Sequence, residues 1–258
     1  IWNKTFGGKE NDVAQMIIQK ENGQFLVAGT TESFDILFSD FWLLNLSSSG
    51  ELIWEKKYGG DDIDKINDLI LGPDSLLASG FTWSKGAGKK DAWLLKLNPK
   101  GGIIWEKTYG GGQDDEFSQV IHQNQAYYLI GNTYSKGSGG KDAWLLHLNE
   151  NGDLKTETLL GGRNSESASS LILTSSSQII FAGKKLRFCP KCHQGGYSYN
   201  WVAQLDENNK ISWEKIFMES ATSQISKLIN TKANELIMVG ETQYNSQGQN
   251  DISIIKMK

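Results

Sequence analysis

The chain has 258 residues, of which 38% are apolar and only 3 are Pro, so it is long enough to bury a core and is not expected to be disordered. Its net charge of −4, without a Lys/Arg cluster interleaved with aromatics, disfavours nucleic-acid binding. No apolar run approaches the ~20 residues that a membrane helix needs, and no membrane span is predicted. The start at Ile1 leads us to expect a mature or trimmed protein whose leader has been removed.

A related segment occurs five times along the chain, at intervals of roughly 50 residues. The repeats begin near residues 1, 53, 104, 155 and 212, and the clearest copy is Ile104–Gly111. Their anchor positions are Trp2, Trp54, Trp105, Thr156 and Trp213. A period of this length, built from short strands, predicts a propeller, and we expect residues 1–258 to form a single domain. A partial ring taken from a longer protein is the alternative.

Each repeat divides into four strand-like runs bounded by Gly, Asn and Asp. In the third repeat these runs are Ile104–Tyr109, Phe117–His122, Ala126–Gly131 and Ala143–Leu148. No window has a sustained 3.6-residue apolar period, so we expect very little helix. These features predict an all-β fold, a five-bladed β-propeller of four-stranded blades. We expect Ile1–Phe6, as the N-terminal strand, to complete the last blade beside Asp251–Met257 and thereby close the ring.

The repeat pattern resembles that of a known group of proteins. The pattern LNxxGxIWEKTYGG followed by DAWLLKLN, clearest in the second and third repeats, resembles repeats of exported bacterial and archaeal β-propeller proteins. The stretch Leu97–Trp105 is similar to the tryptophan-docking motif of quinoprotein dehydrogenase propellers, although no ligands for a quinone cofactor can be assigned. The resemblance implies an exported location, periplasmic, extracellular or at the cell surface, and implies no particular activity.

A second set of tryptophans recurs on the expected third strand of each repeat. It comprises Trp42, Trp93, Trp144 and Trp201, with Ser253 in the fifth repeat. A Trp at the same place in successive blades is best explained by packing between blades, because each ring can bury ~150–250 Å². The alternative is a stacking platform for sugars.

Acidic residues recur shortly after the Gly pair of each of the first four repeats. They are Asp12, Asp64, Asp115 and Glu166. The first interpretation is that each carboxylate caps backbone N–H groups at the start of an inner strand. The alternative is a face that binds a cation or another ligand at the mouth of the channel. Use as glycoside hydrolase carboxylates is a further alternative, but nothing distinguishes an acid from a nucleophile among them.

The repeat breaks in the fourth unit. The stretch from Gly183 to Trp201 is longer than its counterparts and contains Cys189, Cys192 and His193. C-x-x-C-H is the attachment signature of a c-type haem, in which both thiols bond to the haem and the His binds iron. Met218, where the next Gly pair is missing, is expected on the same face and is the candidate for the second iron ligand.

Other interpretations of this loop stay open. Cys189 and Cys192 are the only cysteines, and they could form a disulfide in an oxidising compartment. They could also bind zinc together with His193, or stay as free thiols. No helix is predicted after the motif, in contrast to most cytochromes. His122 and His147 lie in strands of the third repeat and are not obvious partners of the loop.

These observations lead us to predict a non-enzymatic, exported β-propeller that acts as a binding or structural scaffold for an unknown protein or glycan. The first alternative is an electron-transfer protein with one covalent haem c at the Cys189, Cys192 and His193 loop. The second alternative is a glycan-binding or glycoside-hydrolase propeller. The chain could also belong to a larger exported protein or assembly.

Overall fold

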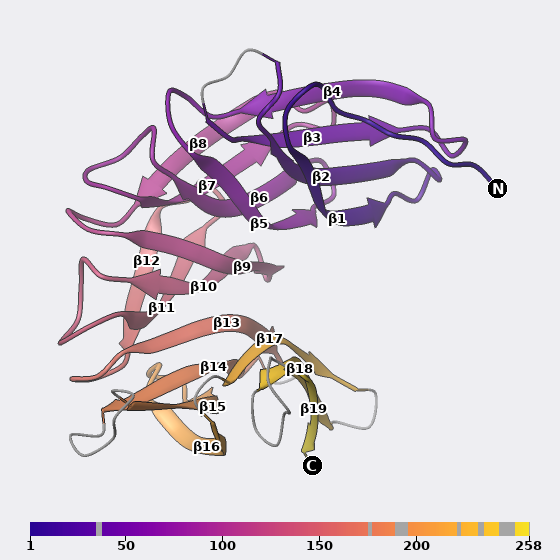
Figure 1. Cartoon of the computed structure of the whole chain (residues 1–258). Coiled ribbons are helices and arrows are strands. Elements are labelled where there is room, and N and C mark those ends of the chain that lie inside the picture. Colours follow the sequence, from indigo (N-terminus) through magenta and orange to yellow (C-terminus); the bar gives the residue numbers. More distant parts are fainter. Residues whose placement is uncertain are drawn as a thin grey trace. The chain divides into compact units, whose positions relative to one another are not determined.

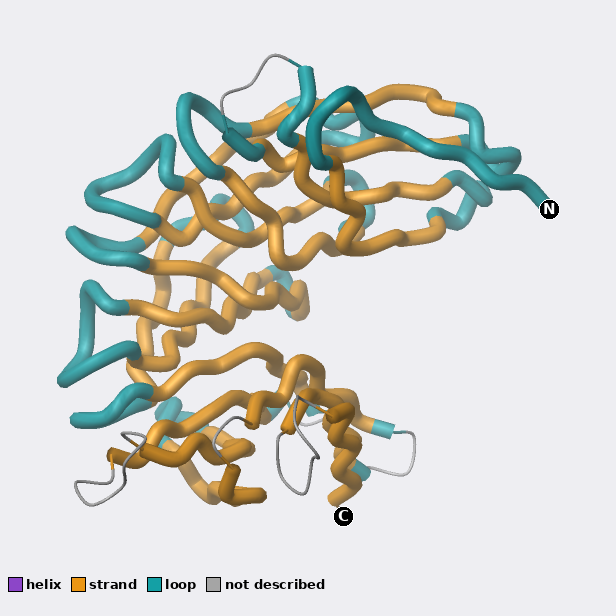
Figure 2. The backbone as a smooth tube through the Cα atoms, viewed as in Figure 1, coloured by secondary structure: helices purple, strands orange, loops and turns teal. Residues whose placement is uncertain are grey.

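The computed structural model describes residues 1–34, 38–174, 177–188, 196–220, 223–231, 235–242 and 251–257. Throughout this described part of the chain, the regular structure is β-strand (Figure 1). The backbone trace accordingly contains strands and loops, and no helix able to cross a membrane occurs among these residues (Figure 2). The chain divides into two compact units, Ile1–Val120 and Ile121–Lys258.

The strands form five sheets. The first contains β1 (Asp12–Gln19), β2 (Phe25–Thr31), β3 (Asp40–Leu46) and β4 (Leu52–Tyr58), and the second contains β5 (Asp64–Leu71), β6 (Leu76–Thr82), β7 (Asp91–Leu97) and β8 (Ile103–Tyr109). The third contains β9 (Asp115–Gln123), β10 (Ala126–Thr133), β11 (Asp142–Asn149) and β12 (Leu154–Leu160). The fourth contains β13 (Glu166–Leu173), β14 (Ile179–Phe188), β15 (Gly196–Leu205) and β16 (Ile211–Ser220), and the fifth contains β17 (Ser223–Asn230), β18 (Leu236–Thr242) and β19 (Asp251–Met257). Neighbouring strands in each sheet follow chain order, so the chain is an all-β, five-bladed β-propeller, as the repeats predict.

The first strand of a blade carries a β-bulge, and the bulge explains a recurring glycine on the second strand. In the second blade the register shifts between Ile66 and Asp68. A Cβ on Gly80 would lie only 2.0 Å from the carbonyl oxygen of Lys65, so no larger residue fits there. The bulged residue, Asn67, donates a hydrogen bond of 2.7 Å from its side-chain amide to the carbonyl oxygen of Phe117 in the next blade. The bulge thus ties neighbouring inner strands together.

The core lies between adjacent blades, and the third strands contribute most to it. Every residue of β3 is buried, and in β7 and β11 only one or two are not. Both faces of a blade pack against apolar side chains, which explains why these strands read as nearly continuous apolar runs. In the first unit, for example, Leu43 of the first blade and Trp93 of the second belong to one buried cluster.

The third-strand tryptophans are packing residues. Trp93, Trp144 and Trp201 have no exposed surface, and Trp42 is only 5% exposed. Their rings are therefore not accessible as a stacking platform for sugars. The packing interpretation of this set is the one that the burial supports.

Trp54, on the fourth strand of the first blade, is half-buried and contacts a glycine in the next blade. Trp2, which is 43% exposed and lies outside the strands, makes a similar contact. A Cβ on Gly101, in the β7–β8 turn, would lie 3.0 Å from a ring carbon of Trp54. A Cβ on Gly50, in the β3–β4 turn, would lie 2.7 Å from the ring of Trp2. Both glycines also have a positive φ, +77° and +80° respectively, which other residues adopt at a cost. The turn therefore needs a glycine at this position as long as the Trp ring packs against it.

The fifth blade differs from the other four because it contains three strands in the described part of the chain. Ile252 and Ile254 on β19 are 81% and 72% exposed, whereas the corresponding residues of β3, Phe41 and Leu43, are completely buried. Ile1–Phe6 carries no strand pairing, although Trp2 contacts the first blade through Phe25 and through a hydrogen bond to Ser48. Completion of the fifth blade by this segment, closure of the ring and the single domain stay predictions.

Replacing Gly101 with Ala should destabilise the protein by about 2 kcal/mol, because the positive φ costs roughly 1–2 kcal/mol and the new methyl group presses on Trp54. Gly112 is the matched control, since its Cβ would meet no atom within 4 Å and its φ is not positive. Urea unfolding of both variants measures the difference. Equal stability of the two variants would contradict the contact between Trp54 and Gly101.

Candidate functional site

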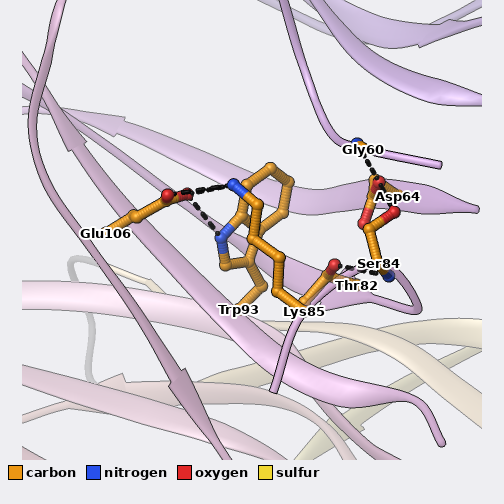
Figure 3. A network of polar contacts seen from close by, with 7 residues as sticks. All are labelled: Gly60, Asp64, Thr82, Ser84, Lys85, Trp93 and Glu106. Carbon is orange, nitrogen blue, oxygen red and sulfur yellow. Dashed lines mark hydrogen bonds and ion pairs between the residues drawn. The ribbon is translucent and has the colours of Figure 1, made fainter. Parts of the chain in front are cut away.

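The first of the recurring polar networks surrounds the carboxylate that opens each inner strand. In the second blade, Asp64 has no exposed surface. It accepts hydrogen bonds from the backbone N–H of Gly60, at 2.9 Å, and from the hydroxyl of Ser84, at 2.6 Å (Figure 3). The carboxylate therefore fixes the Gly-pair turn to the end of the second strand.

The other three carboxylates of this predicted set make the same bond within their own blades. The backbone N–H groups of Gly8, Gly111 and Gly162 donate to Asp12, Asp115 and Glu166 at 2.8, 2.9 and 3.0 Å respectively. Asp115 has no exposed surface and Glu166 is 6% exposed. Each carboxylate serves its own turn, and this geometry favours the capping interpretation over a ligand- or cation-binding face.

The hydrogen bonds also affect ionisation. Burial alone would raise the pKa of Asp12, but hydrogen bonds from Thr31, Gly8 and Ser33 outweigh it and lower this pKa below its usual value. At Glu166 burial prevails over the hydrogen bond from Gly162, and the pKa is raised. Asp12 and Glu166 therefore share one structural role, although their pKa values are shifted in opposite directions.

The second recurring network joins the buried third-strand Trp to a Glu and a Lys. The indole N–H of Trp93 donates to Glu106 at 3.3 Å, and the ammonium of Lys85 lies 2.8 Å from the same carboxylate (Figure 3). In the third blade Trp144, Glu157 and Lys136 repeat the arrangement. The charge pairs lie at the partly exposed edge of the blade, so their main effect is to satisfy the buried indole N–H.

The fourth blade builds this network differently because its hairpin is longer. β14, β15 and β16 each have 10 residues, against 7 in β2, β3 and β4. The β14–β15 pairing continues to Phe188 opposite Gly196. Lys185 on β14 now takes the place of the loop lysines and lies 2.6 Å from Glu214. The sequence insertion therefore lengthens the strands that lead to the cysteine loop.

The proposed haem or zinc ligands Cys189, Cys192 and His193 lie outside the described residues, and so does a disulfide between the two cysteines. Met218 lies on β16 next to the register shift opposite Tyr199 and Asn200, at the same end of the blade as the elongated hairpin. Among the residues that the structure describes, no group of three or more His, Cys, Asp or Glu side chains is placed to hold a metal ion. The covalent haem stays a prediction.

Concave surfaces of different chemistry lie among the described residues of both units. In the first unit a groove of about 1260 Å³ is lined by Trp54, Pro73 and several lysines. In the second unit a pocket of about 330 Å³ is lined by Glu166, Lys185 and Tyr199. A larger pocket of about 690 Å³ in the same unit is lined by Tyr128, His147, Thr156 and the turn that contains Asp206 and Asn209.

The larger pocket was not predicted from the sequence. The sequence shows that Thr156 replaces the anchor Trp of its repeat, but it does not connect Tyr128, His147 or Asn209 with this position. His147 stacks on Tyr128, whereas the His122 ring nitrogen contacts the carboxylate of Glu150. The signal in the sequence is that Tyr128, His147 and Thr156 all differ from their counterparts in the other repeats. Neighbouring strands bring these three residues together, and the next turn adds Asn209.

No model of a known protein family matches the chain, and no curated protein matches its sequence. Solved structures do resemble it. An α-L-arabinanase of Penicillium chrysogenum, complexed with arabinobiose, matches with a TM-score of 0.56 and 8% identity over 93% of this chain and 91% of that one. A neuraminidase-like protein of a bat influenza virus matches with a TM-score of 0.53 and 9% identity over 96% and 79% of the two chains.

The WD40 domain of Neurospora crassa Pan2 matches with a TM-score of 0.52 and 11% identity. This chain is covered over 95% of its length but spans only 63% of the Pan2 chain. At such identities the likeness shows the β-propeller fold alone, because unrelated functions share this fold.

A second acidic position, before the third strand, has a distinct electrostatic environment. Burial, and then the nearby carboxylate of Asp64, raise the pKa of Asp40 to about 6, although Lys57 and Lys85 oppose the shift. Asp40 is only 8% exposed. Because its pKa is higher in the folded state than in the unfolded chain, ionisation of Asp40 weakens the folded state as the pH rises from about 4 through 6.

Replacing Asp40 with Asn should therefore stabilise the protein at pH 7 by about 1–2 kcal/mol relative to the effect of the same replacement at pH 4. One pKa unit corresponds to about 1.4 kcal/mol, and the expected value is reduced because the site is only partly shielded from solvent. Urea unfolding between pH 4 and 7 measures the difference. Replacement of Asp74, which is exposed in the β5–β6 turn, provides the control for removal of a surface carboxylate. A D40N profile parallel to that of the original protein would disprove the electrostatic assignment.

Proposed function

We propose that this protein is a non-enzymatic β-propeller that binds a ligand through surfaces at which its repeat is broken. The proposal is based on a difference between the polar residues that recur along the chain and those that do not. The carboxylates that recur in the first four blades accept hydrogen bonds from nearby backbone N–H groups. The open pocket of the second unit, in contrast, is lined by Tyr128, His147 and Thr156, which do not recur.

The use of the recurring carboxylates argues against a glycoside hydrolase built on them. Such an enzyme needs two carboxyl groups facing one sugar, one of which donates or accepts a proton. Asp64 and Asp115 are completely buried, and each accepts a backbone hydrogen bond that would have to break before a substrate could be reached. The arabinanase resemblance concerns the fold and supports no catalytic role here.

The proposal includes an exported location, which rests on the similarity of the repeats to those of exported propeller proteins. The ligand is a protein or a glycan. Electron transfer through a haem at Cys189, Cys192 and His193 is the alternative that a visible absorption spectrum decides, because only a haem protein shows a Soret band.

Two assays on the whole chain test the proposal. A set of 4-nitrophenyl glycosides, including the α-L-arabinofuranoside and the β-D-xyloside, should release no nitrophenol above the buffer rate. A thermal-shift screen of oligosaccharides, peptides and divalent cations should contain at least one compound that raises the melting temperature, since a ligand at 100 times its Kd stabilises by about 2.7 kcal/mol.

Hydrolysis that disappears in an Asp115→Asn variant would show that the protein is an enzyme and would refute the proposal. The Asp74→Asn variant is the control for indirect effects of removing a carboxylate, because Asp74 is exposed and does not line the pocket of the second unit. A screen without any stabilising compound would equally contradict a binding function.

A further inference from the structure

The larger pocket of the second unit forms where a row of three side chains differs from its counterparts. In the first blade, Leu26, Asn45 and Trp54 lie side by side on β2, β3 and β4. The corresponding row of the second blade is Leu77, Lys96 and Trp105, and that of the fourth is Ile180, Gln204 and Trp213. The third blade carries Tyr128, His147 and Thr156 instead. The third blade therefore has Thr156 in place of a Trp on its fourth strand, β12. Its aromatic rings lie instead on the second and third strands, β10 and β11.

The next turn has changed together with this row. Gly50 and Gly101 lie against Trp2 and Trp54, where no Cβ fits. The β15–β16 turn, which faces Thr156 across the pocket, has Asn209 at the corresponding position with a φ of +58°. Without a Trp ring there is room for this side chain, and Asn tolerates a positive φ better than most residues. Two departures in different blades thus shape the same cavity.

The pocket combines two stacked aromatic rings with polar residues. The rings of Tyr128 and His147 are stacked, with centroids 4.6 Å apart and planes within 6°. The hydroxyl of Thr156 and the side chains of Gln178, Asp206 and Asn209 line the same space. Its volume of about 690 Å³ is in the range of small-molecule sites, which span about 300–1,000 Å³.

The charges around the pocket favour an uncharged ligand. Burial, and then the ammonium of Lys155, lower the pKa of His147, so the imidazole is neutral at pH 7. The carboxylates of Asp206 and Glu207 lie on the opposite side, and Asp206 is already engaged by the backbone N–H groups of Asn208 and Lys210. The two carboxylates repel an anion, and Lys155 offsets their attraction for a cation on the His147 side of the pocket.

We infer that this pocket binds one or two rings of a neutral saccharide. The apolar face of a sugar ring would lie on the outer ring face of the stacked Tyr128–His147 pair. Its hydroxyls would exchange hydrogen bonds with Thr156, Gln178 and the Asp206–Asn209 turn. This inference rests on the proposed binding function and names the ligand class and the surface.

Isothermal titration calorimetry of the whole chain with neutral disaccharides tests the inference. Arabinobiose, xylobiose, cellobiose and maltose are the probes, and digalacturonate and a short Lys-rich peptide are the charged comparisons. At least one neutral disaccharide should bind, and the charged probes should not. His147→Ala should weaken that binding about ten-fold or more, a loss of about 1.4 kcal/mol. Lys96→Ala, at the equivalent position of the second blade, should leave it unchanged.

A second variant restores the repeat in place of deleting a side chain. Thr156→Trp combined with Asn209→Gly recreates the arrangement of Trp54 and Gly101, so the protein should fold with an unchanged or higher melting temperature and lose the saccharide. Asn209→Gly alone provides the folding control. Because the double variant gains contacts, loss of binding in it is not explained by unfolding.

The possible results separate this inference from the proposed function. Binding of a disaccharide that neither His147→Ala nor the double variant changes would overturn the assignment to this pocket and leave the binding function intact. Binding of the charged probes alone would overturn the ligand class. Absence of any bound disaccharide would refute the inference, and the broader thermal-shift screen would then decide the proposed function by itself.

Discussion

A single blade of this protein has two apolar faces and cannot bury both of them alone. The third strands β3, β7 and β11 are covered on both sides, and the buried clusters of both units extend across neighbouring blades. Stability is therefore a property of adjacent pairs, as in other repeat proteins. The Trp–Gly contacts and the side-chain bonds from the first-strand bulges act at the same borders, where they fix how one blade lies against the next.

This dependence on neighbours explains why so many polar residues recur. The backbone N–H groups of a turn between blades need hydrogen-bond acceptors. Asp64 and Asp115 each supply such an acceptor to the turn that precedes them. The indole N–H of Trp93 needs Glu106 for the same reason. A binding site, in contrast, needs different groups around one cavity, and the row Tyr128, His147 and Thr156 meets this condition because it occurs once.

The periodic part of the fold was predictable because each strand repeats a local signal. The predicted runs Ala126–Gly131 and Ala143–Leu148 lie within β10 and β11, and the outermost run Ile104–Tyr109 lies within β8. The capping role of Asp64 could also be foreseen, since a Gly pair before an acidic residue is a turn signal. The pairing of Ile1–Phe6 with the fifth blade stays a prediction, because it depends on a partner distant in the sequence and this segment carries no strand pairing.

The pocket illustrates a second limit on sequence reasoning. Tyr128 and His147 are 19 positions apart and are ordinary strand residues when taken singly, so nothing local marks them as neighbours. Register alone places them opposite each other and sets Thr156 beside them. Comparing the repeats position by position, row by row, would have revealed the change, because the other rows place a Trp where this one has Thr.

The contact between a Trp and the glycine of the following turn also constrains how such a repeat can diverge. Converting a Trp–Gly pair into the Thr156–Asn209 pair takes two substitutions, and the order of the two is not neutral. Changing the glycine first would drive a side chain into an indole that is still present, as a Cβ 3.0 Å from Trp54 or 2.7 Å from Trp2 indicates. Losing the indole first leaves only a partly filled cavity at a half-exposed edge. The less costly order therefore replaces the Trp first, which opens the cavity, and the glycine second, which adds the polar side chain at its rim.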